Sequence, residues 1–494
     1  MKSNGISKCL SIIFCISLYT SNAYTQLSGT KTIPGNYATI SAAVTALNAG
    51  GVGAGGITFN VAANYTETIT STITLTATGT AANPVIFQKN PATSGANPLI
   101  TAYTSGVGTP ATAIQDGIWR LTGSDYITIN AIDVRDNPLN ISNPATMEYG
   151  YALYKTGTNN GCQYITIKNC AITLNRVNNA NGGAPMADGS TGIIMMNAIA
   201  TASVTPLKPI VGGAHSNNKF YSNLIQNCNT GIALIGYAAA SPFTLADTNN
   251  DVGGNSAGTG NSILNYGGAT GALNPAVAIR TLAQYGLNVS YNTINNNNGS
   301  GANHPAALRG IYINTALSAN TTISNNTVTV KGNGSTQIVS AIENASGSTA
   351  AGNAITISNN LISNCTYATA TSGSFYGIYN TASPATLTVT NNTVSNNISA
   401  STTGVFYGLF NAGTALIASM NNNTFSGNSV GASMTGLFCG IYNSTGVKNL
   451  SINNNNLTGN SSASISGPYY AIYNSGAVSA SINMDANNIG NSVS

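Results

Sequence analysis

Asp133, Arg135 and Asp136 stand within four residues of one another and are of the types that polysaccharide-cleaving sites use. Two carboxyl groups that flank a glycosidic bond can act as acid and base, or as acid and nucleophile. The three residues directly follow a strand-like run, 126–132. Because side chains alternate along a strand, Asp133 and Arg135 are expected on one face. They are candidate catalytic residues, and a solvated ion pair between them is the competing interpretation.

Asp247, Asn249 and Asp251 place side-chain oxygens at alternate positions, as calcium-binding loops do. The sixth position of such a loop holds Val252 instead of glycine, and the twelfth holds Gly258 instead of an acidic residue. The segment is therefore either a calcium site or an ordinary polar loop. No other cofactor is indicated by the sequence.

The acidic residues are concentrated in one part of the chain. Eight of the eleven lie between residues 116 and 251, and after Glu343 only Lys448 and Asp485 are charged. Any acid-base or metal chemistry is therefore expected before or near Glu343. The catalytic motifs of lyases and glycosidases match no positions of this sequence, which counts against an enzyme.

Charged residues make up only 5% of the 494-residue chain, far below the roughly 25% of typical soluble domains. Asn, Ser, Thr and Gly must hydrate the surface instead. The formal net charge is +4, and the fifteen basic residues form no run or stripe. Nucleic acid is not expected as a partner, because phosphate binding needs clustered Lys and Arg. After the amino terminus, no segment has the roughly 18 consecutive apolar residues of a membrane span.

A short phrase recurs about every 32 residues in the second half of the chain. It consists of an apolar residue, a polar run rich in Asn, and a second apolar residue. A second marker, Gly-Ile-Tyr-Asn or a variant of it, keeps the same period. A fixed period is the signature of a solenoid, whose units bury their apolar sides only against their neighbours. The copies begin at Val289, Ile323, Ile357, Val389, Met420, Ile452 and Met484.

The composition of the repeat selects an all-β fold, a parallel β-helix with about 32 residues per coil. β-branched residues, Asn and Gly are poor helix formers, and the repeat has no Leu framework, so helical and leucine-rich repeats are set aside. Ile323 and Val328 are expected to point inward. The Asn residues between them are expected to adopt left-handed turn conformations and to stack as a hydrogen-bonded ladder. The predicted turn and ladder residues are Asn325, Asn359, Asn391, Asn422 and Asn454.

The amino terminus reads as a secretory signal peptide over residues 1–23. Lys2 and Lys8 precede an apolar stretch, and small residues at 21–23 suit cleavage. The protein is therefore expected to be secreted or to lie at the cell surface.

Beyond the signal, the chain is expected to begin with a cap. A short amphipathic helix is predicted from Thr39 to Leu47, where it can cover the open end of the solenoid, and Gly50 to Gly56 should end it. The coils that follow are first irregular and then regular. Insertions at 178–190, 199–216 and 238–260 are expected to project as binding loops. The predicted parts are a cap and first coils (24–115), irregular coils (116–280) and regular Asn-rich repeats (281–494).

Three segments carry a resemblance to a known group of proteins. They run from Thr32 to Leu47, from Ile57 to Glu67 and from Gly117 to Ile129. They resemble secreted right-handed β-helix proteins of the pectin-lyase-like class, in particular the surface members that Bacteroidetes-type bacteria export by type IX secretion. The resemblance implies a right-handed coil, but no single activity, because the class includes lyases, glycosidases and adhesins. Such surface members end in a sorting domain, whereas this sequence stops inside a repeat, so we expect either a truncated chain or a far end that another element caps.

The aromatic residues of the second marker recur in step with the coils. They are predicted to stack along one strand, and a platform on which sugars stack is the functional alternative. The members of this column are Tyr312, Tyr379, Phe410, Tyr442 and Tyr473.

The signal peptide, the charge-poor repeats and the missing catalytic motif favour a non-catalytic extracellular protein for adhesion, matrix formation or glycan contact. The alternative is a polysaccharide-active enzyme, a lyase or a glycoside hydrolase, with its site on the irregular coils 116–280. In both cases the expected partner is a polysaccharide or a cell-surface glycan.

Overall fold

The structure is a computed structural model that describes most of the chain after the predicted signal peptide, which itself lies outside the described residues. Of the predicted loop from 178 to 190, only Ser190 lies within the described residues. The described ranges are 25–104, 116–142, 145–176, 190–200, 206–268, 275–299, 304–317, 319–463 and 466–490.

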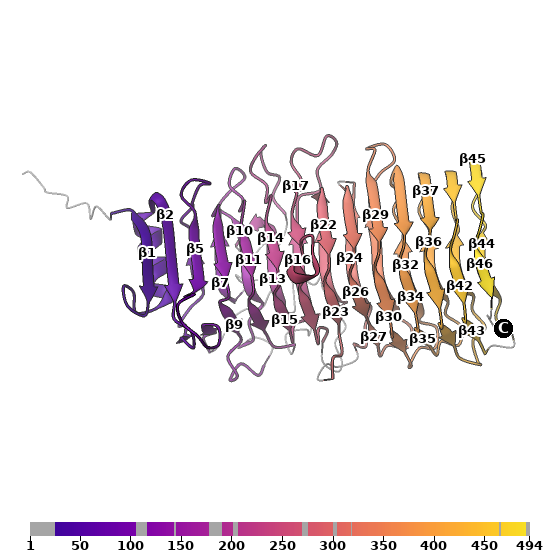
Figure 1. Ribbon diagram of the computed structural model, residues 1–494, viewed down its shortest axis with the longest axis horizontal. Helices are drawn as coiled ribbons and strands as arrows, with labels where there is room; N and C mark the ends of the chain where they lie inside the picture. Colours follow the sequence, from indigo (N-terminus) through magenta and orange to yellow (C-terminus); the bar gives the residue numbers. More distant parts are fainter. Residues whose placement is uncertain are drawn as a thin grey trace, which may run out of the picture.

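The chain winds into a parallel β-helix of about 13 turns with about 32 residues per turn, which confirms the predicted fold class. Successive coils stack along one axis, so that three long sheets run the length of the molecule (Figure 1). In each sheet, every strand pairs in parallel with the equivalent strand of the next coil. This arrangement gives every coil the same inward and outward positions, and columns of equivalent residues result.

The 14-stranded sheet begins with the first strand of the described chain and passes through every coil. Its strands, in spatial order, are β1 (Leu27–Ile33), β2 (Val52–Val61), β5 (Val85–Lys89), β8 (Ile127–Asn130), β11 (Thr166–Lys168), β14 (Lys219–Tyr221), β18 (Asp251–Val252), β22 (Leu287–Ser290), β25 (Thr321–Ser324), β29 (Ala354–Ser358), β33 (Thr386–Thr390), β37 (Ala415–Asn421), β41 (Val447–Ser451) and β45 (Val478–Asn483).

The 13-stranded sheet consists of short strands that follow a turn after those of the first sheet. Its members are β3 (Thr66–Thr68), β6 (Leu99–Thr101), β9 (Asp133–Arg135), β12 (Ala171–Thr173), β15 (Leu224–Gln226), β19 (Ser262–Leu264), β23 (Thr293–Asn295), β26 (Thr327–Thr329), β30 (Leu361–Ser363), β34 (Thr393–Ser395), β38 (Thr424–Ser426), β42 (Asn456–Thr458) and β46 (Asn488–Gly490).

The 12-stranded sheet carries the longer strands on which the candidate site lies. They are β4 (Ile73–Leu75), β7 (Gly117–Thr122), β10 (Tyr149–Lys155), β13 (Thr191–Ile199), β16 (Thr230–Ile235), β20 (Ala276–Leu282), β24 (Leu308–Ala316), β28 (Ile338–Ser346), β32 (Ser374–Asn380), β36 (Phe406–Asn411), β40 (Phe438–Asn443) and β44 (Tyr469–Asn474).

Two small sheets and a 3-10 turn complete the coils. The turn is η2 (Ala257–Thr259), and β17 and β18 show that part of the predicted loop from 238 to 260 is built into the coils. The five-stranded sheet is β27 (Lys331–Gly332), β31 (Thr366–Tyr367), β35 (Ile398–Ser399), β39 (Ser429–Val430) and β43 (Ser461–Ser462), and the two-stranded sheet is β17 (Asp247–Thr248) with β21 (Gln284–Tyr285).

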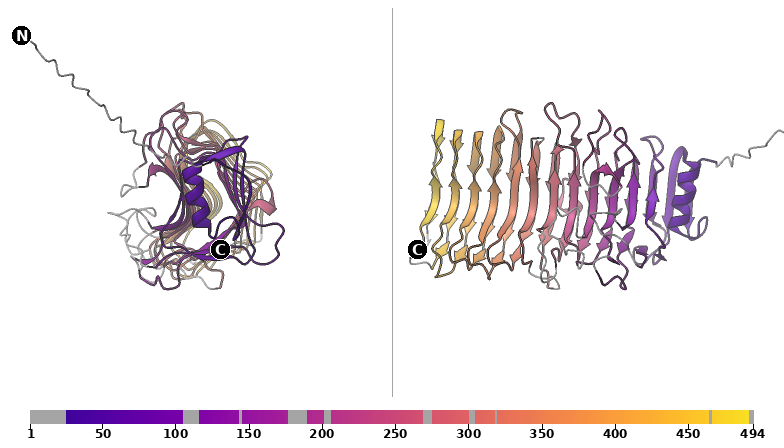
Figure 2. Two further views of the ribbon diagram at one scale, coloured as in Figure 1. Left: turned by 90° about the vertical axis from the view of Figure 1, so that its left-hand side faces the viewer. Right: turned by 180° about the vertical axis from the view of Figure 1, so that it is seen from behind.

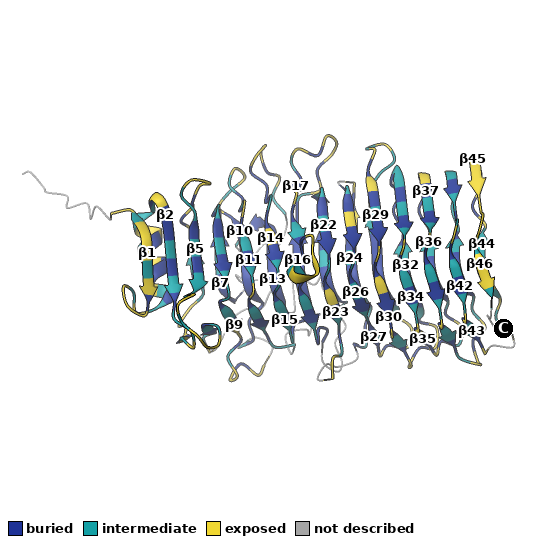
Figure 3. Cartoon of the chain, in the orientation of Figure 1, coloured by how far each residue is buried: buried dark blue, intermediate teal, exposed yellow. Residues whose placement is uncertain are grey.

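The interior is a continuous apolar core. Ile323 and Val328 are fully buried, as predicted. Phe375, Phe406 and Phe438 stack on one another inside successive coils, with ring centroids 4.9 Å apart. Buried positions follow the strands from end to end, whereas the last coil is largely exposed (Figure 3). Stacked columns of apolar side chains at equivalent positions of successive coils therefore hold the coils in register.

The predicted capping helix is confirmed as α1 (Ile40–Gly50), which lies across one end of the solenoid (Figure 2). The Thr39 hydroxyl accepts a hydrogen bond from the Ala42 N–H, at 3.0 Å, and satisfies one of the free donors of the first turn. The Glu67 carboxylate accepts a second, from the Ile40 N–H at 2.8 Å. None of the helices in the described ranges is long and apolar enough to cross a membrane.

The predicted Asn turn is confirmed, but the ladder lies one residue further along. Asn325 and its equivalents have φ between 55° and 57°, the left-handed conformation that Asn tolerates. The Asn that follows each of them is buried and hydrogen-bonds to its equivalent in the next coil. The rungs are Asn223, Asn261, Asn292, Asn326, Asn360, Asn392, Asn423, Asn455 and Asn487.

Candidate functional site

Asp133, Arg135 and Asp136 lie on and just after β9, and the structure gives each of them separate partners. Asp133 and Arg135 share a face, as predicted, but they do not pair. Asp133 Oδ1 accepts hydrogen bonds from Asn97 Nδ2 at 2.9 Å and from the Ala171 N–H at 2.8 Å. Arg135 Nε donates to a threonine hydroxyl of β6 at 3.0 Å. The expected ion pair is therefore wrong.

Asp136 turns toward the backbone of its own coil. Its Oδ2 accepts from the Met147 N–H at 3.0 Å, and its Oδ1 accepts from Asn140 Nδ2 at 2.8 Å. Burial raises the pKa of the Asp133 and Asp136 carboxyl groups. These contacts favour a structural role for Asp136.

The calcium candidates Asp247, Asn249 and Asp251 do not share partners. Asp247 is fully buried and accepts from the His215 N–H at 3.0 Å, and burial raises its pKa to about 7. Asp251 accepts from the Gly254 N–H, also at 3.0 Å. Asn249 occupies a left-handed turn, with φ of 54°. Within the described ranges, no group of three or more His, Cys, Asp or Glu residues could hold a metal ion.

Most carboxylates of the described coils bind backbone amides at corners between strands. Such a carboxylate satisfies a donor that the turn leaves without a partner, which is the role that Asn plays in the regular coils. The pairs are Glu67 with Ile40, Asp125 with Gln163, Asp133 with Ala171, Asp136 with Met147, Glu148 with Asp116, Asp247 with His215 and Asp251 with Gly254. The acidic residues are thereby distributed over corners of several coils instead of gathering in one groove.

Glu343 differs from these carboxylates, because it binds side chains on the outer face of the 12-stranded sheet. Arg309 Nε donates to Glu343 Oε2 at 2.7 Å, and the Ser340 hydroxyl donates to the same oxygen at 2.8 Å. The Arg309 guanidinium also lies over the Tyr312 ring, 4.5 Å from its centroid. Arg309 is therefore fixed by an ion pair on one side and a cation–π contact on the other.

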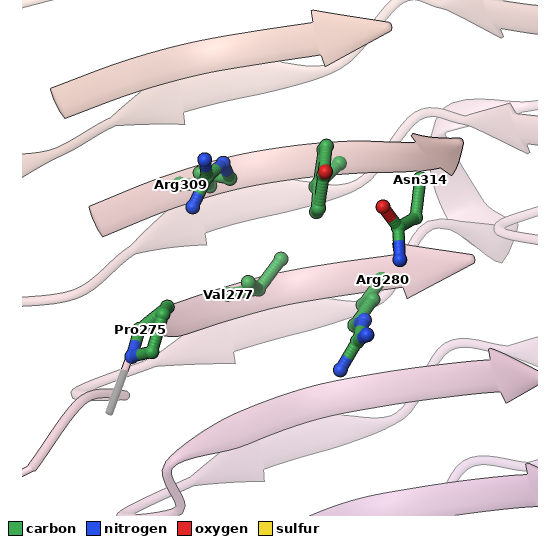
Figure 4. A pocket seen from close by; sticks show the side chains of 6 residues that line it. Pro275, Val277, Arg280, Arg309 and Asn314 are labelled. Carbon is green, nitrogen blue, oxygen red and sulfur yellow. The ribbon is translucent and has the colours of Figure 1, made fainter. Parts of the chain in front are cut away.

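Arg280 lies one coil before Tyr312, in register with it. Together with Arg309, Tyr312 and Asn314 it lines a hollow of about 280 Å³ (Figure 4). We call this hollow the arginine hollow; Pro275 and Val277 complete its lining. Its two arginines come from the adjacent strands β20 and β24. The hollow therefore offers two guanidinium groups and an aromatic ring on one face.

The Arg280 guanidinium has incomplete hydrogen bonding. Its Nε and Nη1 atoms are buried and have no hydrogen-bond partner among the described residues. Burial lowers its pKa, but an arginine keeps its charge at neutral pH. Burying a cation without a counter-charge is costly. The described part of the chain therefore leaves the charge on Arg280 uncompensated.

Beyond Glu343 the outer face carries a run of aromatic side chains, which we call the aromatic band. Tyr379 and Phe410 stack with centroids 5.3 Å apart and an interplanar angle of 10°, and Phe410 stacks on Tyr442 at 5.0 Å. The ring faces thus cover one another, and the edges are left half-exposed. The members are Tyr376, Tyr379, Tyr407, Phe410, Tyr442, Tyr470 and Tyr473.

The predicted aromatic column is confirmed from Tyr379 to Tyr473, but Glu343 separates Tyr312 from it. A flat platform for sugar rings needs exposed ring faces, and here neighbouring rings occupy most of them. The band instead presents edges and hydroxyl groups.

The same outer face is covered at β10, β13 and β16. Ala152, Ile194 and Ala233, which occupy the column of Arg280, are almost fully buried. Part of the predicted loop 199–216 lies beside β13, where the Leu207 N–H donates to the carbonyl of Asn197 at 2.7 Å. Arg120 on β7, in the same column, is partly exposed, so the outer face is open at β7 and opens again at β20.

Sequence reasoning missed Arg280, Arg309 and Glu343. Both arginines lack a charged neighbour within three residues along the chain. The signal that could have found them is the register of the second marker, because aligning Ala341-Ile-Glu343 with Gly310-Ile-Tyr312 places Glu343 in the tyrosine column.

Comparisons with known proteins return structural likeness only. No protein-family model matches the chain, and a search of curated proteins finds no match. A lacto-N-biosidase from Eubacterium ramulus is similar with a TM-score of 0.41 and 12% identity, over 88% of this chain and 64% of that one, so this chain spans less than two thirds of its length. PfbA, a surface adhesin of Streptococcus pneumoniae, has a TM-score of 0.37 and 11% identity over 92% and 89%. A pectate lyase has a TM-score of 0.33 and 14% identity over 73% and 72%.

Proposed function

We propose that the protein is an extracellular, non-catalytic glycan-binding protein that holds an extended polysaccharide along the outer face of the 12-stranded sheet, from β20 to β44. The observation that carries the proposal is the continuity of this face. The arginine hollow, the Arg309–Glu343 pair and the aromatic band occupy consecutive coils on a molecule that is otherwise poor in charge.

The geometry of the face suits a linear polymer. Neighbouring strands are about 4.8 Å apart, so each coil offers its outward side chains at a spacing close to the length of one sugar unit in an extended chain. Tyrosine edges supply apolar contact, and their hydroxyls can donate to and accept from sugar hydroxyls. A long row of weak, equivalent contacts gives useful affinity only to a polymer that engages many of them at once.

The positions and hydrogen bonds of the carboxylates favour a binding role over cleavage. Glycosidases place two carboxyl groups about 5 to 9.5 Å apart, on either side of the scissile bond. Here Asp133, Asp136 and Asp251 lie on two different sheets or their corners, and each binds a backbone amide. Asp116 and Glu148 are adjacent, but both are almost fully buried and the Asp116 N–H donates to Glu148.

The test is retention of the purified protein on a panel of immobilised polysaccharides, with and without calcium. Tyr442→Ser should weaken retention several-fold, because it removes a ring in the middle of the aromatic band. Tyr164→Ser is the matched control: Tyr164 is exposed and stacks on Tyr126 at 4.5 Å, but it lies beside the 14-stranded sheet.

Equal loss in both variants, or retention of none of the polysaccharides by the wild type, would contradict the proposal. Reducing ends or unsaturated products released during the incubation would support the competing enzyme instead.

A further inference from the structure

We propose that the arginine hollow binds an acidic group of the glycan, a carboxylate or a sulfate, with Arg280 as the residue that neutralises it. The inference rests on the proposed function and adds the chemical class of the ligand: a negatively charged polysaccharide.

The charges around the hollow do not balance in the described ranges. The hollow has two guanidinium groups, Arg280 and Arg309, and the only carboxylate paired with either of them there is Glu343, which binds Arg309 and Ser340. Tyr312 is neutral at physiological pH, because the ordinary pKa of a tyrosine is near 10 and burial raises it. One positive charge therefore remains without a counter-charge among the described residues, and an acidic ligand would supply it.

Arg280 also differs in its hydrogen bonds from Arg120, which occupies the same column near the other end of the sheet. Arg120 Nη2 donates to the Thr74 hydroxyl of the preceding coil at 3.1 Å. The coil before Arg280 offers Ala233 at the equivalent position, which has no acceptor in its side chain. Arg280 thus lacks the partner that the fold provides for Arg120.

The remaining lining of the hollow also suits a sugar that carries an acidic group. Asn314 contributes an amide, and Val277 and Pro275 contribute apolar surface (Figure 4). A guanidinium attracts an oxyanion by its charge, while apolar walls strengthen the attraction by excluding water. A sugar ring that bears one acidic group matches this combination of an amide, an apolar wall and a cation.

The hollow lies where the open face begins, next to the aromatic band. A polysaccharide that follows the band toward β20 would reach Arg280 after passing Glu343. An acidic group there would fix the register of the chain, since Glu343, two coils after Arg280, repels a second acidic group and favours a neutral sugar at its own position.

The experiment measures the affinity of the purified protein for oligogalacturonate, a sulfated carrageenan oligosaccharide and the neutral cellohexaose, by calorimetry at low and high salt. The variant is Arg280→Met, which keeps the length and apolar stem of the side chain and removes its charge. Lys448→Met is the control, because it removes an exposed positive charge from the 14-stranded sheet of the same regular coils.

The expected result is at least a tenfold loss of affinity for an acidic oligosaccharide in Arg280→Met, with no change for cellohexaose and none in Lys448→Met. Added salt should weaken acidic binding to the wild type. A thermal midpoint of Arg280→Met equal to or above that of the wild type would show that the variant folds. Comparison of the first two ligands tells carboxylate from sulfate.

Unchanged affinity for both acidic ligands in Arg280→Met would overturn the inference, as would an equal loss for cellohexaose. If the wild type binds cellohexaose but neither acidic ligand, the inference fails while the proposed function stands. If it binds none of the three ligands and no polysaccharide of the wider panel, both fail.

Discussion

At the scale of single residues, the buried amide of the ladder Asn explains why the repeat phrase is so rich in Asn. Asn360 Nδ2 donates to the Ile323 carbonyl at 3.0 Å and to Asn392 Oδ1 at 2.9 Å, and Asn360 Oδ1 accepts from Asn326. One side chain therefore joins three coils. An amide is the smallest side chain that can donate and accept in this way at a buried corner.

Asn360→Ala should lower the free energy of unfolding by about 2–4 kcal/mol, because it leaves the buried Asn326 N–H without its acceptor and removes one of the two acceptors of the Asn326 amide. Asn359→Gly is the matched control. Asn359 is exposed and has φ of 55°, which glycine adopts freely, so the change should lie within about 0.5 kcal/mol. Urea denaturation of the two variants checks this, and equal losses would refute the ladder.

The ladder position could not be chosen from the sequence, although the turn could. Every copy of the phrase except the first holds two or more consecutive Asn, and both turn and ladder favour this residue. Only the geometry of the corner decides that one Asn takes the left-handed conformation while the next one turns inward. Residue preference alone cannot distinguish two neighbouring positions, the turn and the ladder, that favour Asn for different reasons.

His215 gives the protein a pH dependence of stability. The ring is fully buried; Nδ1 accepts from the Cys162 N–H and Nε2 donates to the Met196 carbonyl, both at 2.8 Å. Burial, followed by the charge of Lys155, lowers its pKa from 6.5 to about 3. Between these pH values His215 binds a proton in the unfolded chain but not in the folded chain. The free energy of unfolding therefore falls as the pH drops from 6.5 toward 3.

The advantage of the wild type over His215→Gln should accordingly shrink below pH 6.5, by at most about 1.4 kcal/mol per pH unit. Asp247 acts in the opposite sense, because its raised pKa favours the folded state as the pH falls, from about 7 to 3.8. Both proteins retain Asp247, so its contribution largely cancels. Thermal midpoints between pH 7.5 and 4.5 provide the measurement, and a difference that stays constant over this range would count against a buried neutral ring.

At the scale of elements, the cap and the sheets were predictable because each has a local signature. Thr39 followed by an amphipathic pattern marks the helix, and the period of about 32 residues marks the coils. One element differed from expectation: β2 begins at Val52, inside the Gly-rich stretch that was expected to end the helix. Glycines in this stretch allow the chain to leave α1 at Gly51, where φ is 71°.

Glu67→Ala should destabilise the cap by about 1–2 kcal/mol, since two amide groups of the first turn, those of Ile40 and Ser41, lose their acceptor. Hydrogen exchange should rise in α1 and remain unchanged in the regular coils. Thr39→Ala, which removes the neighbouring cap at Ala42, should give a loss of similar size in the same place. Increased exchange throughout the molecule would show that α1 does not act as a separate cap.

The candidate site was not predictable from the sequence, because its residues come from separate coils. Arg280 and Glu343 are 63 residues apart along the chain, yet a single strand, β24, lies between theirs in the sheet. Spacing along the chain reveals such a site only after the register of irregular coils is known, and insertions before residue 280 obscure that register. The irregular coils were the expected place for function, but the open face begins where they end.

At the scale of the whole molecule, the residues that hold the coils together are separate from those of the proposed binding face. The inward columns and the Asn ladder hold the coils together. On the outer face of the 12-stranded sheet, the side chains are apolar and covered at β10 to β16, charged at β20 to β28 and aromatic from β32 onward. A solenoid allows this separation because outward positions contribute little to the packing of coils. The proposed polysaccharide would lie parallel to the long axis.

Hydroxyl-radical footprinting of the protein with and without a bound polysaccharide tests this account most directly, because it reports which side chains a ligand covers. We predict protection of Tyr379, Tyr442 and Tyr473 together with Tyr312, and no protection of Tyr164 on the 14-stranded side. Protection of Tyr164 with the aromatic band unchanged would contradict the claim that the outer face of the 12-stranded sheet binds the glycan.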